Sequence, residues 1–166
     1  MVEPVAERPT MPGYGVDGPG WRPLPWSWAA AKLAVSRNLW LVTASADGRP
    51  HALPVWGVWD ESTNRFGWSS SARSRKVANI AANPQACVTV DDTVECVSVE
   101  GRAALVTDPI AVDGWIDRFL VKYEGEGVTA DFLRSHAFLE LVPDRAFGVI
   151  ERADEFATRA TRWRFG

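Results

Sequence analysis

The segment that most limits the possible folds is residues 52–59, a strand-like stretch that is apolar on both faces. Side chains along a strand point alternately to its two faces. One face would carry Leu53, Val55, Gly57 and Trp59, and the other would carry Pro54, Trp56 and Val58. Both faces then need cover, from the core on one side and from a ligand or a second subunit on the other. The segment therefore predicts a β domain with a covered outer surface.

Similar strand patterns, separated by turn residues, run through most of the chain. We expect strands over residues 39–44, 65–70, 86–90, 94–106, 138–143 with 146–151, and 161–165. Asp47 and Gly48 are typical of a hairpin turn. Five to seven strands with a few helices at the rim predict a mainly β (α+β) fold, arranged as a small closed or half-closed barrel.

Helical patterns are few and short. We expect helices over residues 26–37, 71–83 and 129–135, and a helical stretch that starts at Asp108 and includes Tyr123. Residues 1–25 are rich in proline and glycine and predict an extended arm, either disordered or lying across a partner subunit. The domain itself is expected to span residues 26–166.

Composition limits the classes of function. A chain of 166 residues with 46% hydrophobic content is enough for one domain with its own core. Its net charge of −3 does not predict the long basic stripes that bind nucleic acid or membranes. No apolar run approaches the roughly 20 residues of a membrane span. The first residues also lack the pattern of a secretory signal, so we expect a cytoplasmic protein.

Residues with catalytic or metal-binding chemistry are sparse. Cys87 and Cys96 lie in apolar, strand-like surroundings without zinc spacing, and we expect buried structural thiols and no metal. His51 and His136 are too isolated to form a metal site, and a structural role is expected for each. The sequence contains no hydrolase elbow, zinc-protease motif or phosphate-loop glycine pattern, so no catalytic residue is assigned.

The most informative segment is WSSSARSRK, residues 68–76, where a strand ends in hydroxyls and a helix opens with three cations. Cations at a helix start oppose the helix dipole, and an anion would reverse that cost. A phosphate there would contact the free amides of the first turn, the hydroxyls of Ser69, Ser71 and Ser74, and the charges of Arg73, Arg75 and Lys76. Alternatively, Ser71 or Ser74 caps the helix and the cations are solvated. The residues alone leave both interpretations open.

A second basic pattern lies in residues 159–165, where Arg159, Arg162 and Arg164 alternate with Trp163 and Phe165. These arginines either extend a basic groove toward an acidic cofactor tail or protect an exposed edge strand. We favour the edge strand, in which the arginines face solvent.

Six short motifs follow one another in a fixed order. They are DGRP (47–50), LPVWGVW (53–59), FGWSSS (66–71), SRK (74–76), NP (83–84) and EGRA (100–103). This order resembles the split-barrel flavin and deazaflavin oxidoreductases, the superfamily of pyridoxamine 5′-phosphate oxidase. Residues 39–106 carry the resemblance well, and the rest of the chain carries it loosely.

The resemblance implies a six- to seven-stranded antiparallel split β-barrel with short peripheral helices, which forms a homodimer. It implies a flavin-like ring between the subunits, with the cofactor phosphate at the SRK helix. It also puts Trp56 beside the ring, with a plain dimer-interface anchor as the alternative. The expected cofactor-binding residues are Pro54, Val55, Trp56, Ser69, Ser71, Arg73, Ser74, Arg75 and Lys76.

Two positions in the second strand bear on the choice of cofactor. Members that bind FMN usually carry an arginine at the start of that strand and a lysine five residues later, where this chain has His51 and Trp56. The apolar strand resembles the branch that uses coenzyme F420. We therefore expect F420, with FMN as the alternative and with haem, another ligand or none as further possibilities.

The function that the resemblance implies is an F420-dependent oxidoreductase. It would transfer a hydride between the deazaflavin and a small unsaturated or quinone-like organic substrate, while the protein binds, orients and excludes water. One alternative is an FMN-binding oxidoreductase like pyridoxamine-phosphate oxidase. The other is a non-catalytic carrier of F420 or flavin.

Overall fold

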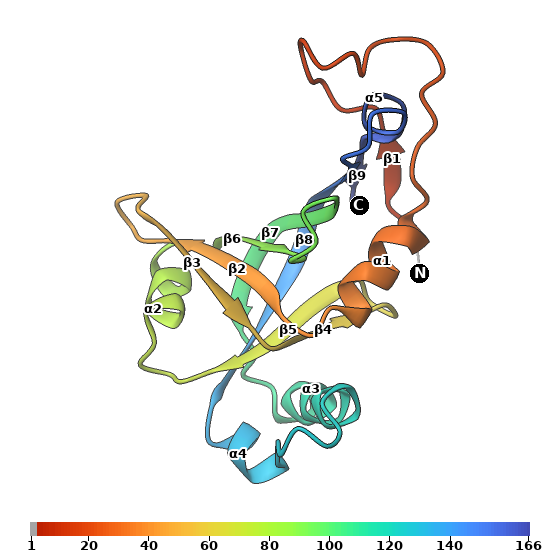
Figure 1. Cartoon of the computed structure of the whole chain (residues 1–166). Coiled ribbons are helices and arrows are strands. Elements are labelled where there is room, and N and C mark those ends of the chain that lie inside the picture. The colour runs from red at the N-terminus through yellow and green to blue at the C-terminus, as the bar shows by residue number, and fades with distance from the viewer. Residues whose placement is uncertain (1–2) are drawn as a thin grey trace.

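The computed structural model describes residues 3–166 and shows one strongly curved antiparallel β-sheet with short helices around it (Figure 1). The strands are β1 (Val5–Glu7), β2 (Leu39–Ala44), β3 (Pro50–Val55), β4 (Gly57–Asp60), β5 (Arg65–Ser70), β6 (Gln85–Thr89), β7 (Glu95–Leu105), β8 (Ala137–Ile150) and β9 (Thr161–Arg164). The helices are α1 (Trp26–Val35), α2 (Arg75–Ala82), α3 (Pro109–Lys122), α4 (Ala130–Arg134) and α5 (Phe156–Arg159). The expected mainly β, α+β fold is confirmed.

The strands curl into a split barrel because β3 and β4 belong to one bent segment. Along the sheet the order is β1-β9-β8-β7-β6-β2-β3, and the first part of β8 also pairs with β5, which pairs with β4. β3 and β4 lie directly on either side of Trp56, so this segment joins β2 on one side and β5 on the other. The single strand expected over residues 52–59 is therefore two strands, and the expectation of six to seven strands was too low.

The bend between β3 and β4 is held by the last turn of α3. The Gly57 N–H donates to Tyr123 Oη at 2.7 Å, and Lys122 Nζ donates to the Gly57 carbonyl at 2.8 Å. Tyr123 Oη also lies 2.9 Å from the Arg37 carbonyl, so its one hydroxyl ties three segments together. A Cβ on residue 57 would lie 2.1 Å from the Phe66 ring, so only glycine fits. Both backbone groups of the bend are thus bonded away from water.

Two clusters of buried side chains lie on opposite faces of β5. The barrel core contains Phe66 and Trp68, whereas the second cluster, formed with α3 and α4, contains Trp115 and Phe119. α3 approaches the strand closely because residue 67 is a glycine, and a Cβ there would lie 2.4 Å from the Trp115 ring. Figure 1 shows α3 and α4 together below the sheet. The glycine in β5 therefore fixes where this helical pair sits.

The proline-rich segment before α1 contains the unexpected strand β1. This strand pairs with β9 of the same chain, and Glu7 forms ion pairs with Arg162 and Arg164 at 2.9 Å each. β9 therefore has β8 on one side and β1 on the other, so the expectation of an edge strand over residues 161–165 was wrong. Its arginines are paired because a carboxylate on β1 lies opposite them.

The other helices lie close to their expected positions, with one informative shift. α2 begins at Arg75 and not at residue 71, because residues 71–74 form a turn in which the Ser74 N–H donates to the Ser71 carbonyl at 2.9 Å. α5 is a short helix that the sequence pattern did not indicate. The shift leaves all of residues 71–74 as a link between β5 and α2.

Cys87 and Cys96 are free thiols, and each is half-buried, where full burial was expected. Burial raises the pKa of the Cys87 thiol to about 11, which makes it a poor nucleophile. In residues 3–166, no helix is long and apolar enough to cross a membrane. Within the same range, His, Cys, Asp and Glu side chains form no group of three that could hold a metal ion.

The half-buried ammonium of Lys122 at the bend makes stability depend on pH. Burial lowers the pKa of Lys122 to about 8, against roughly 10.4 in an unfolded chain. Between these values the unfolded chain holds a proton that the folded chain has lost, so this residue makes the free energy of unfolding rise with pH. We expect wild type to gain stability relative to Lys122→Met between about pH 8 and about pH 10, measured by urea unfolding. Parallel curves for the two proteins would contradict this.

A second prediction concerns the contact between β5 and α3. Gly67→Ala places a methyl group against the Trp115 ring and is expected to lower the free energy of unfolding by about 1–3 kcal/mol. Gly114→Ala, on α3 itself, is the control, because its Cβ would meet only the flexible end of Arg118 at 3.3 Å. The control should keep or raise stability, since alanine favours helix more than glycine does. Equal melting temperatures for Gly67→Ala and wild type would rule out the tight contact.

Candidate functional site

Two hollows lie beside the end of β5 and the link to α2. The polar pocket is a hollow of about 200 Å³ lined by Ser45, Asp47, Arg49, Pro50, His51, Arg75 and Asn79. The apolar pocket is a hollow of about 360 Å³ lined by Trp56, Ser69, Ser70, Ser71, Phe119, Val128, Phe132, Leu133 and His136. The expected site segment thus takes part in both, through Arg75 in the first and Ser69 and Ser71 in the second.

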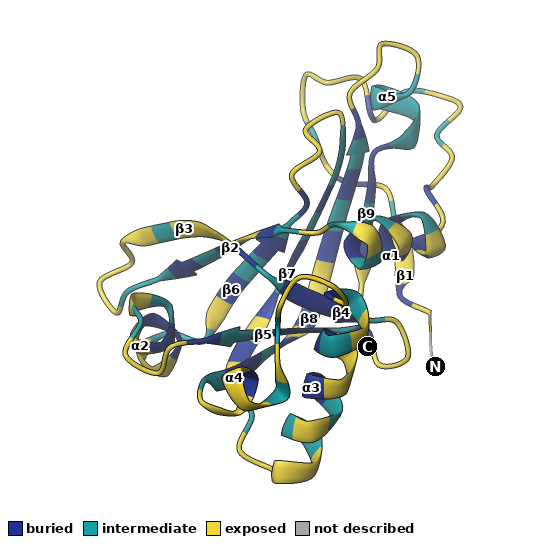
Figure 2. Cartoon of the chain, turned by 60° about the horizontal axis from the view of Figure 1, so that its bottom comes forward, coloured by how far each residue is buried: buried dark blue, intermediate teal, exposed yellow. Residues whose placement is uncertain are grey.

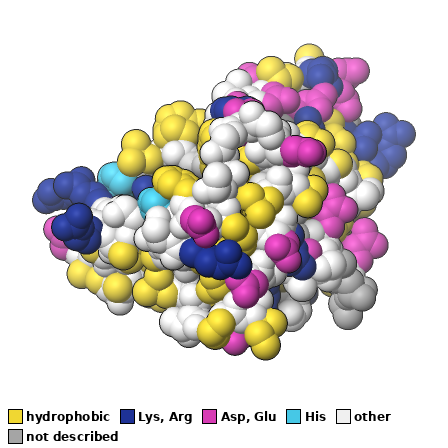
Figure 3. Space-filling view, turned by 90° about the horizontal axis from the view of Figure 1, so that it is seen from below, with side chains coloured by type: hydrophobic (Ala, Val, Ile, Leu, Met, Phe, Trp, Pro, Cys, Tyr) yellow, Lys and Arg dark blue, Asp and Glu magenta, His cyan; other side chains and the backbone are white. Residues whose placement is uncertain are grey.

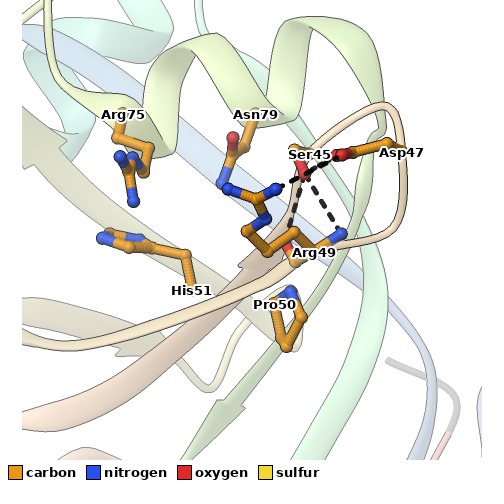
Figure 4. A pocket seen from close by; sticks show the side chains of 7 residues that line it. All are labelled: Ser45, Asp47, Arg49, Pro50, His51, Arg75 and Asn79. Carbon is orange, nitrogen blue, oxygen red and sulfur yellow. Dashed lines mark hydrogen bonds and ion pairs between the residues drawn. The ribbon is translucent and has the colours of Figure 1, made fainter.

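The polar pocket lies between the β2–β3 hairpin and the start of α2. Figure 4 shows Arg75 of α2 facing His51 of β3 across it, with the Arg49 side chain toward Asn79. One carboxylate is present, since the Ser45 hydroxyl bonds to Asp47 and keeps the pKa of that carboxyl below its usual value. Asp47 lies 3.9 Å from the Arg49 guanidinium. Arg75 has no carboxylate partner in residues 3–166, so the pocket keeps an excess of positive charge.

The start of α2 is open to a ligand. Ser74 occupies the cap position but makes no capping bond, because its hydroxyl bonds to Ser70 Oγ at 2.9 Å instead. Ser71 Oγ lies 3.4 Å from the Arg73 amide, which precedes the helix. A serine cap, one of the two interpretations of the sequence, is therefore wrong. The first-turn amides of α2 have no side-chain acceptor in the described part of the chain.

The cations of this segment are also unpaired. Arg73 and Arg75 are exposed and Lys76 is half-buried, and none of them forms a side-chain hydrogen bond or ion pair within residues 3–166. Figure 3 shows Lys and Arg side chains gathered at the end of the molecule that carries α2 and the β2–β3 hairpin. Uncapped amides and unpaired cations at one helix start are what an anion-binding site requires.

Trp56 forms a fixed wall between the bend and the apolar pocket. Tyr123 stacks on it with ring centroids 4.6 Å apart and an angle of 8° between planes. The Arg37 guanidinium lies 5.0 Å from the Trp56 centroid and pairs with Glu126 at 2.8 Å. These neighbours hold the half-buried indole in place, and Trp56 lines the apolar pocket.

The remaining expected residues have different surroundings. The Val55 side chain packs in the barrel core, and Pro54 lies exposed on the outer face of β3. Arg73, Ser74 and Lys76 line neither pocket and lie on the link and the first turn of α2. The structure thus gathers most of the segment 69–76 but separates it from Val55.

Two parts of the site were not predicted from sequence patterns. Arg49 was noticed only within a turn motif, and His51 was considered isolated, yet both lie in the polar pocket with Arg75. Phe132 of α4 and His136, which follows α4, also line the apolar pocket. The DGRP turn motif (47–50) was the sequence signal for Arg49. A hairpin that lies beside the start of α2 brings its charged side chains to that helix start.

The outer face of the sheet has an apolar area around Trp40, which is 43% exposed. Strand register places Trp40 beside Pro54 and Thr89, and the same face continues into β7. Figure 2 shows exposed and intermediate colours along β3 and its neighbours. The outward side chains around Trp40 are Val42, Ala52, Pro54, Cys87 and Thr89, and the same face carries Glu100 beside Cys87, where Glu100 pairs with Arg145. We call this surface the outer face.

Residues 29–150, which run from within α1 to the end of β8, match the family model of pyridoxamine 5′-phosphate oxidase. The chain belongs to the pyridoxamine 5′-phosphate oxidase family. The resemblance drawn from the order of motifs is therefore confirmed. The family binds FMN or F420, and most of its members are oxidoreductases.

Several solved structures of low sequence identity share the fold of this chain. A conserved hypothetical protein from Mycobacterium tuberculosis is 21% identical, with a TM-score of 0.64 over 74% of this chain and 82% of that one. An F420 reductase is 21% identical, with a TM-score of 0.57 over 70% and 93%. HutZ, the heme storage protein from Vibrio cholerae, is 18% identical, with a TM-score of 0.55 over 65% and 82%. No curated protein matches the sequence.

Proposed function

We propose that this chain is an F420-dependent oxidoreductase that transfers a hydride between the deazaflavin and a small unsaturated or quinone-like substrate. The observation that supports this most is the uncapped start of α2, where Arg73, Arg75 and Lys76 have no partner within residues 3–166. Both cofactors of the family carry a phosphate. The residues present fit that group, because helix amides without a side-chain cap and unpaired cations are the groups that bind a phosphate.

The polar pocket supports a cofactor with acidic groups besides the phosphate. Arg49 and Arg75 reach it from two different elements, and His51 lies between them on β3. His51 and Trp56 stand where FMN-binding members of the resembling superfamily carry arginine and lysine. The Trp56 indole is neutral and has a single N–H donor, so it cannot replace the missing lysine. F420 is therefore the cofactor that we propose, with FMN as the alternative.

The protein's own contribution is binding, orientation and exclusion of water. When bound, F420 supplies the hydride chemistry. Arg75 and the amides of α2 would hold the phosphate, and Ser69 would lie toward the apolar pocket. Trp56 and Phe119 give that pocket apolar walls, which would limit the water beside a bound cofactor and substrate. A carrier needs no such second pocket beside its ligand, so the pocket supports an enzyme.

We also propose that two copies of the chain pair through the outer face. Trp40 is 43% exposed there, and its neighbours on β3 and β6 are uncharged. An exposed apolar area on a sheet face is unfavourable in water and is usually covered. A second copy supplies the same surface, since a two-fold interface is self-complementary. The covered outer surface that residues 52–59 predicted would then be a subunit interface.

Substitutions at the start of α2 test the phosphate site. Arg75→Ala and Lys76→Ala are each expected to weaken F420 binding by about 1–3 kcal/mol, because each removes a charge-assisted hydrogen bond to phosphate. Quenching of F420 fluorescence measures the affinity, with FMN titrated in parallel. Arg22→Ala is the control, because Arg22 is an exposed arginine before α1 and lines neither pocket. This variant should bind as wild type does. Unchanged affinity in both test variants, or binding of neither cofactor at micromolar levels, would refute the proposed function.

The dimer is tested by charge on the outer face. Trp40→Glu is expected to give monomers at micromolar concentration where wild type gives dimers, as measured by sedimentation velocity, because a buried unpaired carboxylate is costly. Val35→Glu is the matched control, since Val35 is an exposed apolar residue at the end of α1. It should remain dimeric. Wild-type protein that sediments as a monomer would overturn the proposed pairing.

A further inference from the structure

We propose that Lys122 is a covalent modification site, whose side-chain amine forms an imine with small, uncharged aliphatic aldehydes. Lys122 lines a third hollow, of about 460 Å³, which we call the helix hollow. Ala34 lines it from α1, and Asp117, Arg118, Val121 and Lys122 line it from α3. None of these residues lines the polar pocket or the apolar pocket. The inference is therefore independent of the proposed function.

The contacts of the Lys122 amine differ from those of an ion-paired lysine. The chain contains three lysines. Lys32 pairs with Glu95 at 2.6 Å and with Asp92 at 3.6 Å, so two carboxylates hold its ammonium. Lys76 lies in the first turn of α2, outside the helix hollow. Lys122 Nζ forms no ion pair within residues 3–166 and donates to a neutral backbone carbonyl at 2.8 Å.

These contacts leave the Lys122 amine available as a nucleophile. Burial lowers the pKa of Lys122 to about 8, so near that pH a large share of the amine is neutral. The Gly57 carbonyl accepts one N–H and cannot bind the lone pair of the nitrogen. A desolvated lysine amine with a free lone pair attacks carbonyl compounds. The helix hollow gives such a compound room beside the side chain.

The reaction needs no further reactant. The nitrogen lone pair attacks the aldehyde carbon, and a proton moves from nitrogen to the carbonyl oxygen. The carbinolamine then loses water as the C=N bond forms, and nothing is oxidised or reduced. The neutral imine has no N–H, so the Gly57 carbonyl keeps only Tyr123 Oη, 3.0 Å away, which also bonds to the Arg37 carbonyl. Modification of Lys122 therefore changes the bonding at the bend.

The walls of the helix hollow favour an aldehyde that is apolar and uncharged. Ala34 and Val121 line it with methyl groups, and Val121 is 79% exposed. The Arg118 guanidinium is already occupied, since it pairs with Asp60 at 3.1 Å and donates to a backbone carbonyl of α3 at 2.8 Å. The Asp117 carboxylate has no ion-pair partner within residues 3–166 and repels an anion. An alkyl chain gains contact here, whereas a carboxylate gains no partner.

Reductive trapping on the full chain tests this proposal. Hexanal and sodium cyanoborohydride at about pH 8 convert the imine into a stable hexylamine. Mass spectrometry of peptides locates it and separates it from label on the α-amino group of the chain. We expect Lys122 to be labelled about tenfold faster than Nα-acetyllysine amide, because more of its amine is neutral. Lys32 should stay unlabelled over the same time.

Variants of α3 supply the controls. Val121→Ser and Ile110→Ser are matched, since both residues are exposed and apolar but only Val121 lines the helix hollow. Val121→Ser is expected to slow labelling by hexanal about threefold, because it removes part of the apolar wall. Ile110→Ser should be labelled as wild type is. Lys122→Arg keeps a donor for the bend but forms no imine, so the fast label should disappear.

Two results would overturn the proposal. One is labelling of Lys122 no faster than that of Lys32 or of Nα-acetyllysine amide. The other concerns the class of aldehyde and uses glyoxylate, which is anionic. Measured against Nα-acetyllysine amide, glyoxylate should label Lys122 more slowly than hexanal does, and equal relative rates would refute an apolar site. Neither result depends on binding of F420 or FMN, on which the proposed function stands or fails.

Discussion

The rest of the structure depends on how the peptide groups of Gly57 are bonded. Its N–H and carbonyl would be left unpaired where β3 turns into β4, and Tyr123 and Lys122 supply the missing partners. The bend lets one segment pair with β2 and with β5, which closes the barrel. The same contacts place α3 against the sheet and Trp56 beside the apolar pocket. A few hydrogen bonds thus set both the shape of the barrel and the wall of a candidate site.

The strands that sequence patterns located best are those with a clear alternation and turn residues at both ends. The bounds of β2 and β5 agree with expectation, because Leu39 and Leu41 face the core while their neighbours do not. The break after Val55 was not predictable in this way, since it depends on side chains that follow it by more than 60 residues. β1 was missed for a similar reason. Three residues in a proline-rich segment become a strand only through pairing with β9.

The candidate site was predictable where its chemistry lies in consecutive residues. Cations at a helix start were visible in Arg73, Arg75 and Lys76, and they have no ion-pair partner among residues 3–166. The facing half of the polar pocket was not predictable, because Arg49 and His51 meet Arg75 only once the barrel is closed. The apolar pocket was hidden for the same reason. Its residues come from β5, from the bend and from the segment that contains α3 and α4. No local sequence pattern links these three parts of the chain.

The pairing of β1 with β9 has a consequence for the order of folding. Glu7 and Arg162 are 155 residues apart in sequence, so closing that contact carries a large loss of chain entropy before any bond forms. The strand pairs of the barrel between them join residues that are at most 75 apart in sequence, as Phe66 and Leu141 are. We therefore infer that β1 docks late onto an already formed barrel. Amide hydrogens of β1 should then exchange with solvent through a local opening, well before those of the barrel core.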